Sequence, residues 1–210
     1  MQAQPSAPTP LRMRKRAWTD VARILSTVCN PFLTSLALFV ILAGASSRGT
    51  HDFWTLLFNS AFFTSIAPML FIFVLYATDR ISDLDMSIRA ERERVFIAFV
   101  IFYALGALDL WLIHAPPIMT ASMAGYAASA LVVQWITRYW KISTHALGIT
   151  APLIALTVLF GARPAPFYAL IPLVGWSRVY LRAHTVLQVV AGTLLALTTT
   201  LIFFRIFRVL

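Results

Sequence analysis

The sequence predicts an all-α membrane protein, a single polytopic bundle of six or seven transmembrane helices. Apolar residues make up 60% of the 210 residues and charged residues only 12%, whereas soluble domains average about 45–50% and about 25%. The mean hydropathy is +0.79. The apolar residues also gather in runs close to the ~20 residues that a helix needs to cross a bilayer. Together these observations exclude an ordinary soluble domain.

Residues 1–17 are expected to form a disordered tail at the membrane surface. They contain Pro5, Pro8 and Pro10, followed by a cluster of arginines and a lysine. Such a composition cannot bury a core, and its cations favour the headgroup region. The remaining residues, 18–210, are predicted to form one transmembrane domain.

Seven apolar segments follow, and helix-interrupting residues separate most of them. Gly44 to Gly49 ends the first segment, the charged stretch 79–94 ends the second, and Pro116-Pro117 ends the third. Arg138 to Lys141 ends the fourth and Gly161 to Pro166 the fifth. The first segment is longer than the roughly 7–15 apolar residues of a signal peptide. The sixth is short and can cross or re-enter, which leaves six or seven spans. The segments lie at 24–45, 53–77, 95–114, 118–137, 145–161, 167–181 and 185–207.

Seven crossings place most of the positive charge on one face of the membrane. Each crossing reverses the side on which the chain emerges, so the tail and the segments 79–94, 138–144 and 177–184 share a face. Most of the 17 lysines and arginines belong to these segments. Because positively charged loops are retained on the cytoplasmic side, this face and the N-terminus are predicted to be cytoplasmic.

The formal net charge of +9 indicates an anionic partner. The cations lie at the ends of lipid-length segments, which favours anionic headgroups or an anionic substrate over nucleic acid. Membrane lipids are therefore the expected partners, whereas the oligomeric state and any partner subunit have no signature in the sequence. Cys29 is the only cysteine, which excludes a disulfide within the chain.

Two polar clusters lie in the last third of the chain. Residues 141–145 (KISTH) precede the fifth apolar segment, and residues 177–184 (SRVYLRAH) precede the seventh. Each cluster combines a cation, a hydroxyl and an imidazole. Guanidinium and hydroxyl groups donate hydrogen bonds to phosphate oxygens, and an imidazole exchanges protons near neutral pH. The clusters therefore predict a phosphate site at the membrane surface.

The spacing within these clusters resembles the signatures of the type 2 phosphatidic acid phosphatase (PAP2) superfamily. The last family signature, Ser-Arg, five residues, His, three residues and Asp, is similar to Ser177-Arg178, His184 and Gln188. The second, Pro-Ser-Gly-His, is similar to Ile142-Ser143-Thr144-His145. The first, Lys, six residues and Arg-Pro, is similar only at Arg94, since Ser87 and Val95 stand at the lysine and proline positions. The chain is most similar to a divergent branch of small membrane members that also carries glutamine in place of the aspartate.

The resemblance implies a PAP2-like helical core and hydrolysis of a lipid phosphate or diphosphate monoester, with no metal or other cofactor. It implies that His184 attacks phosphorus and forms a phosphohistidine, and that His145 protonates the leaving oxygen. Gln188 follows His184 by four residues and shares its helix face, so its carbonyl can accept the ring N–H and orient the imidazole. The residues expected to bind the phosphate are Arg94, Arg178, Ser143 and Lys141.

Two other functions stay open at this stage. Glutamine supplies no charge to stabilise an imidazolium, and loss of the orienting acid in the serine protease triad costs about 10⁴ in turnover. The chain could therefore be a catalytically silent lipid-phosphate binder or a subunit of a membrane complex. Alternatively, Asp79, Asp83 and Asp85 could hold Mg²⁺ and a diphosphate, as in a membrane prenyltransferase, although the eight acids of the chain form no second cluster.

Overall fold

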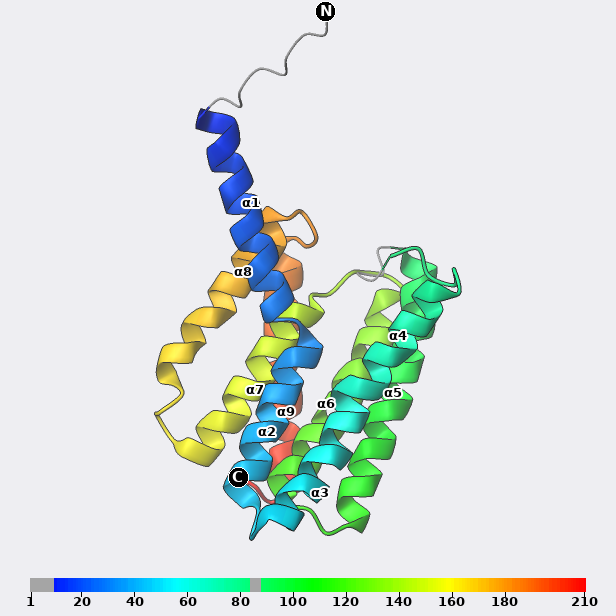
Figure 1. Cartoon of the computed structure of the whole chain (residues 1–210), viewed down its shortest axis with the longest axis vertical. Coiled ribbons are helices and arrows are strands. Elements are labelled where there is room, and N and C mark those ends of the chain that lie inside the picture. The colour runs from blue at the N-terminus through cyan, green and yellow to red at the C-terminus, as the bar shows by residue number, and fades with distance from the viewer. Residues whose placement is uncertain (1–9, 84–87) are drawn as a thin grey trace, which may run out of the picture.

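The computed structural model of the protein describes residues 10–83 and 88–210. These residues are helical apart from the connecting loops, and no β-strand occurs among them. The predicted all-α class is therefore confirmed. Figure 1 shows an elongated bundle with the first helix protruding from one end.

A bent pair of helices begins the described chain. The axes of α1 (Pro10–Val28) and α2 (Pro31–Ser46) differ by 47°. Between them, the Asn30 side chain accepts hydrogen bonds from the backbone N–H groups of Phe32 and Leu33, at 3.0 and 2.9 Å. A capping asparagine followed by proline starts a new helix, so the predicted segment 24–45 is interrupted.

Residues 10–17 differ from the disordered tail that the sequence predicts, because they form the first turns of α1. Pro10 occupies the first helical position, where a missing N–H costs nothing. Leucine, methionine, arginine and lysine fill positions 11–16, and all four are good helix formers. The rest of the predicted tail, residues 1–9, lies outside the described residues.

The remaining helices follow the predicted segments closely. A continuous helical run covers α3 and α4, and a π-helical turn over Phe62–Ile66 lies just before Pro68, where the proline ring disfavours a regular turn. A 3₁₀ turn over Ala165–Ala169 precedes α8. The bounds are α3 (Thr50–Ala61), α4 (Ala67–Ala77), α5 (Arg89–Leu112), α6 (Pro117–Thr137), α7 (Thr144–Phe160), α8 (Leu170–Tyr180) and α9 (Val186–Ile206).

Three helices of the described chain are long and apolar enough to cross a membrane, and a fourth is added if the bent pair α1 and α2 forms one span. This composition is compatible with a membrane protein. α7 is apolar but shorter, and α8 has only 11 residues. The three helices cover Thr50–Ala77, Ala90–Leu112 and Val186–Ile206.

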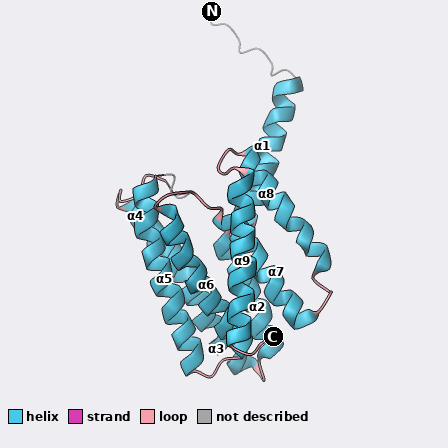
Figure 2. Ribbon diagram, turned by 180° about the vertical axis from the view of Figure 1, so that it is seen from behind, coloured by secondary structure: helices cyan, strands magenta, loops and turns pink. Residues whose placement is uncertain are grey.

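The packing of the helices brings distant loops together. α5 pairs with α6, while α7 contacts both α2 and α9, and the two views in Figures 1 and 2 show α8 and α1 on the opposite side of the bundle from α4 and α5. The loops around residues 78–83, 138–143 and 181–185 lie at one end, near α1 (Figure 1). Both polar clusters therefore reach the same end of the bundle.

Candidate functional site

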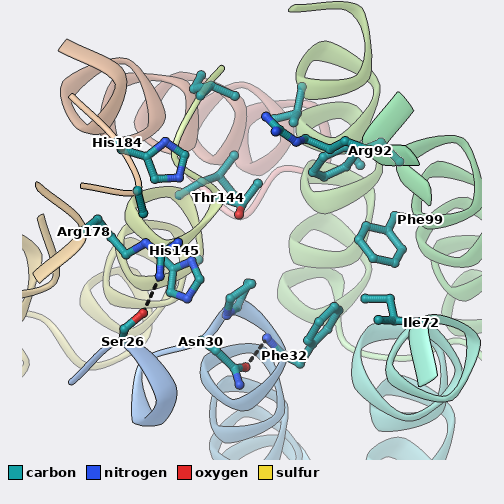
Figure 3. Close-up of a pocket in the computed structure, with 18 of the residues that line it drawn as sticks. Ser26, Asn30, Phe32, Ile72, Arg92, Phe99, Thr144, His145, Arg178 and His184 are labelled. Carbon is teal, nitrogen blue, oxygen red and sulfur yellow. Dashed lines mark hydrogen bonds between the residues drawn. The ribbon is translucent and has the colours of Figure 1, made fainter. Parts of the chain in front are cut away.

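A cavity of about 790 Å³ lies at this end of the bundle. Side chains from α1, α2, α4, α5, α6 and α7 and from the α8–α9 junction line it. His145 and His184, from the two polar clusters, both line this cavity. Figure 3 shows the two histidines and Arg178 on one side, and Arg92 and Phe99 on the other.

The end of α8 places His184 close to Arg178. The backbone carbonyl of Arg178 accepts hydrogen bonds from the N–H groups of Ala183 and His184, at 3.0 and 3.2 Å, and the N–H of Arg182 donates to the carbonyl of Val179 at 2.9 Å. Arg182 has a left-handed φ of 55°. This is a Schellman cap, which folds the chain back over the last helical turn. The two functional side chains consequently face one cavity.

Gln188 contacts His184 at the start of α9. Thr185 caps this helix, since its hydroxyl accepts from the N–H of Gln188 at 3.3 Å and its own N–H donates to Gln188 Oε1 at 3.0 Å. Such a reciprocal capping box holds both side chains in place. The same Oε1 lies 3.3 Å from His184 Nδ1, in agreement with the predicted orienting contact.

These contacts assign the tautomer of His184. A backbone N–H can only donate, so the Gln188 atom beside the N–H of Thr185 must be the amide oxygen. An amide oxygen can only accept, so Nδ1 of His184 carries the hydrogen. Nε2 therefore keeps its lone pair, which is the form that a nucleophilic imidazole needs.

A close contact between α9 and the preceding loop brings the second cluster to the first. The N–H of Ser143 donates to the backbone carbonyl of Gln188 at 3.1 Å. One turn further along α9, a Cβ on Gly192 would lie only 2.3 Å from the carbonyl oxygen of Ser143. Only glycine allows this approach. The contact connects the start of α7, and with it His145, to the helix that orients His184.

α1 contributes a side chain that the sequence analysis does not identify. Trp18 of α1 packs edge-on against Trp176 of α8, with ring centroids 5.9 Å apart. Ser26, two turns further along α1, accepts a hydrogen bond from Nη1 of Arg178 (Figure 3). His145 lies within electrostatic reach of Arg178 and His184. The Ser26 contact fixes the guanidinium between the two helices beside the histidines.

The structure brings most of the predicted site residues together, but not all. His145, His184, Arg178 and Lys141 line the cavity. The exposed Arg94 does not line it, because α5 points position 94 away from the bundle. Ser143 is fully buried and does not line the cavity either; its hydroxyl accepts from the N–H of Ala146 and caps α7.

Two neighbours occupy the places expected for these residues. Arg92, which is 9% exposed, lines the cavity from α5, and Thr144 lines it from α7. Helical periodicity carries a signal for Arg92, since it shares a face with Phe96 and Phe99 at spacings of four and three. No comparable signal marks Ser26, because its role depends on the packing of α1 against α8.

The acidic residues of the prenyltransferase alternative either do not line this cavity or fall outside the described residues. Asp79 and Asp83 do not line it. Asp85, and Ser87 at the lysine position of the first signature, fall within residues 84–87, which are not described.

His184 is held in its neutral form. Burial lowers its pKa to about 3, with further lowering by Lys141 and Arg178. The hydrogen bond that His184 donates to Gln188 opposes this lowering of the pKa, and Arg92 adds to it. A second hollow of about 610 Å³, on the outer side of the junction, is lined by His184, Lys141 and Gln188. His184 thus lines both hollows.

The lowered pKa predicts that the protein loses stability in acid. Below its unfolded pKa of 6.5, His184 takes up a proton in the unfolded chain, whereas in the folded chain it does so only near 3. The free energy of unfolding should therefore fall, by up to about 1.4 kcal/mol per pH unit, as the pH decreases through this window, and level off above it. Thermal melts of wild type and His184→Asn, at neutral pH and at about pH 5, test this. An equal pH dependence in the variant would contradict it.

No protein-family model matches this chain, and neither a curated protein nor a solved structure shows significant similarity to it.

Proposed function

We propose that this protein is an integral membrane phosphatase that hydrolyses a lipid phosphate or diphosphate monoester through a phosphohistidine on His184. The observation that carries the proposal is the imidazole of His184, whose Nδ1 is engaged by Gln188 and which lines a cavity together with Arg178, Lys141 and Arg92. A nucleophile surrounded by cations fits a phosphate ester better than a neutral ester. The PAP2 resemblance of residues 141–145 and 177–188 points to the same chemistry.

In the first step, Nε2 of His184 attacks phosphorus. The N–P bond forms, the bond from phosphorus to the ester oxygen breaks, and His145 supplies the proton that the leaving oxygen needs. Gln188 accepts the Nδ1–H as positive charge develops on the ring. The products are a phosphorylated His184 and a lipid alcohol, or a lipid monophosphate where the substrate is a diphosphate.

In the second step, water attacks phosphorus and the N–P bond breaks. His145 takes the proton from the water, so both residues return to their starting states and inorganic phosphate leaves. Water can enter and phosphate can leave by the outer hollow, which also borders His184. No further reactant is needed to balance the two steps.

The phosphate oxygens are bound by donors from separate elements. Arg178 offers a planar guanidinium that Ser26 already orients, and Arg92 lines the opposite side of the cavity (Figure 3). Lys141 and the Thr144 hydroxyl complete the set. Charge-assisted donors of this kind stabilise the charge that spreads over the transferring phosphoryl group. Arg92 and Thr144 thus take the roles that the sequence assigns to Arg94 and Ser143.

The lipid character of the substrate follows from the surroundings of the site. In this proposal the seven apolar segments form six or seven spans of a PAP2-like core, and the basic end of the bundle faces the cytoplasm. The site then lies at headgroup depth, where phosphate groups of lipids are found. The oligomeric state does not enter the proposal.

A phosphate-release assay tests the function directly. Purified protein in EDTA is incubated with phosphatidate, phosphatidylglycerophosphate and a polyprenyl diphosphate, and inorganic phosphate is measured. Release from at least one of them, inhibited by vanadate, is expected, because vanadate can mimic pentavalent phosphorus beside a histidine. Binding without release would favour the silent lipid-phosphate binder. Release of inorganic diphosphate from the polyprenyl diphosphate, only when Mg²⁺ replaces EDTA, would favour the prenyltransferase alternative.

Two substitutions at Gln188 are expected to distinguish its role in fixing the tautomer of His184 from the effect of a negative charge at this position. Gln188→Leu removes the acceptor for Nδ1–H, so turnover should fall by up to about 10⁴-fold, the cost of a wrong tautomer in the serine protease triad. Gln188→Glu keeps the acceptor and raises the pKa of His184, so turnover should rise by no more than about 10-fold. Initial rates of both variants, with melting temperatures as a folding control, test this. Wild-type rates in Gln188→Leu would contradict the orienting role.

A further inference from the structure

The cavity that contains His184 continues well below its polar end. Along α5 its lining residues are Arg92, Phe96, Phe99 and Tyr103, whose spacings of four, three and four place them on one helix face. Arg92 lies at the basic end of the bundle and Tyr103 lies deeper. With a rise of 1.5 Å per residue, their separation of eleven positions corresponds to a depth of about 16 Å.

Apolar side chains from three other helices line this deeper part. Phe32 of α2 packs edge-on against Phe99, with ring centroids 5.7 Å apart. Ile72 of α4 lines the cavity on the same side, and Figure 3 shows it beside Phe99. Val133 and Ala130 of α6 also line it. We call this part of the cavity, lined by these residues and the α5 face, the apolar compartment.

Two tyrosines form the floor of the apolar compartment. The rings of Tyr103 and Tyr126 lie 6.0 Å apart, and Tyr126 packs against Phe39 of α2 at 6.3 Å. Below them the bundle is closed by fully buried side chains such as Phe39 and Met123. A ligand that enters from the polar end therefore meets a fixed stop.

The depth of the cavity from Arg92 to Tyr103 is close to the length of a lipid chain in one leaflet. The hydrocarbon core of a bilayer is about 30 Å thick, or about 15 Å per leaflet. With its phosphate beside Arg92 and His184, a lipid therefore has room for a chain of one-leaflet length above the floor. We propose that the apolar compartment binds one hydrocarbon chain of the substrate and that Tyr103 and Tyr126 limit its length. This inference rests on the proposed function and adds to it the class of substrate tail.

The compartment positions the substrate more than it strengthens binding. A hydrocarbon chain gains little by moving from lipid into an apolar protein cavity, because both surroundings are equally apolar. A chain seated in the cavity against Phe99 and Ile72 is, however, fixed along its length, which fixes the distance of its phosphorus from His184. Alignment of this kind lowers the entropic part of a reaction barrier.

Photo-crosslinking in lipid nanodiscs tests where the chain lies. The probes are hexyl and dodecyl phosphonates with a diazirine on the terminal carbon, and their C–P bond resists hydrolysis. The dodecyl probe is expected to label peptides around Tyr103 and Tyr126, and the hexyl probe to label nearer Phe96. Labelling that does not move with chain length, or that falls only on the outward faces of α3 and α4, would overturn the inference.

A pair of variants sharpens the test. Ala130→Phe places a ring in the apolar compartment and should abolish labelling of the floor by the dodecyl probe. Ala104→Phe makes the same change on the exposed face of α5 and should leave the labelling unchanged. Equal labelling in both variants would contradict the compartment. If Ala130→Phe does not fold, the shift of the label between the hexyl and dodecyl probes in the wild type still tests whether the chain lies in the apolar compartment.

The proposed function and this inference can fail separately. If the label moves with chain length but no substrate releases phosphate, the protein binds a lipid phosphate without hydrolysing it. The apolar compartment is then supported as a chain-binding site and the phosphatase is not. If phosphate is released but the label lies outside the bundle, the phosphatase stands and the compartment is wrong.

Discussion

Replacing His184 with alanine is expected to abolish phosphate release, with a loss of at least about 10³-fold. The nucleophile is the one group whose removal leaves no bond-forming atom at phosphorus, and single removals of this kind are among the largest effects seen in enzymes. The loss should appear in turnover, and trapping of labelled phosphate on the protein should disappear with it. Initial rates and acid-quenched labelling measure the two effects.

A second substitution at the same position controls for folding. Asparagine can place its side-chain N–H near the position of Nδ1 and still donate to Gln188, so His184→Asn should fold like the wild type and be equally inactive. His51→Ala, an exposed histidine in the first turn of α3, should retain full activity. Because His51 lies outside the cavity lining, it reports any general effect of removing a histidine. Residual turnover in His184→Ala without loss of labelling would place the nucleophile elsewhere.

The sequence predicts the helices of this protein better than it predicts their breaks. Long apolar runs give element type and length directly, and the bounds of α5, α6 and α9 fall within a few residues of the prediction, except that α5 begins earlier. The break between α1 and α2 is harder to foresee, since Asn30-Pro31 lies inside an apolar run. A single capping side chain there outweighs the hydropathy of its neighbours.

The site shows the same division between local and tertiary information. His184 and Gln188 are four residues apart, so their contact follows from helix geometry and the spacing predicts it. Arg94 is selected by its distance from a motif rather than by its helix face, whereas the apolar pattern of α5 directs Arg92 inward. Ser26 reaches Arg178 across 152 positions of sequence, and only the packing of α1 on α8 creates that contact.

Gly192→Ala is expected to separate the two halves of the site without touching any proposed catalytic group. The new Cβ would lie 2.3 Å from the carbonyl oxygen of Ser143, and a backbone atom cannot move aside without shifting the start of α7. Overpacking of this kind costs about 1–3 kcal/mol. The hydrogen bond from Ser143 to Gln188 should lengthen, and His145 should move away from His184. A large fall in turnover, together with a lower melting temperature, is therefore expected.

The same substitution at Gly125 isolates the steric effect. Gly125 lies in α6, and a Cβ there meets its nearest neighbours, Phe203 and Thr199, at an ordinary 3.9 Å. Because alanine is a better helix former than glycine, Gly125→Ala should raise stability by about 0.5–1 kcal/mol and leave turnover unchanged. If both variants were equally active, the contact between α9 and Ser143 would not control the site. If only Gly192→Ala is impaired, the approach of α9 to Ser143 is what brings the two histidines into one cavity.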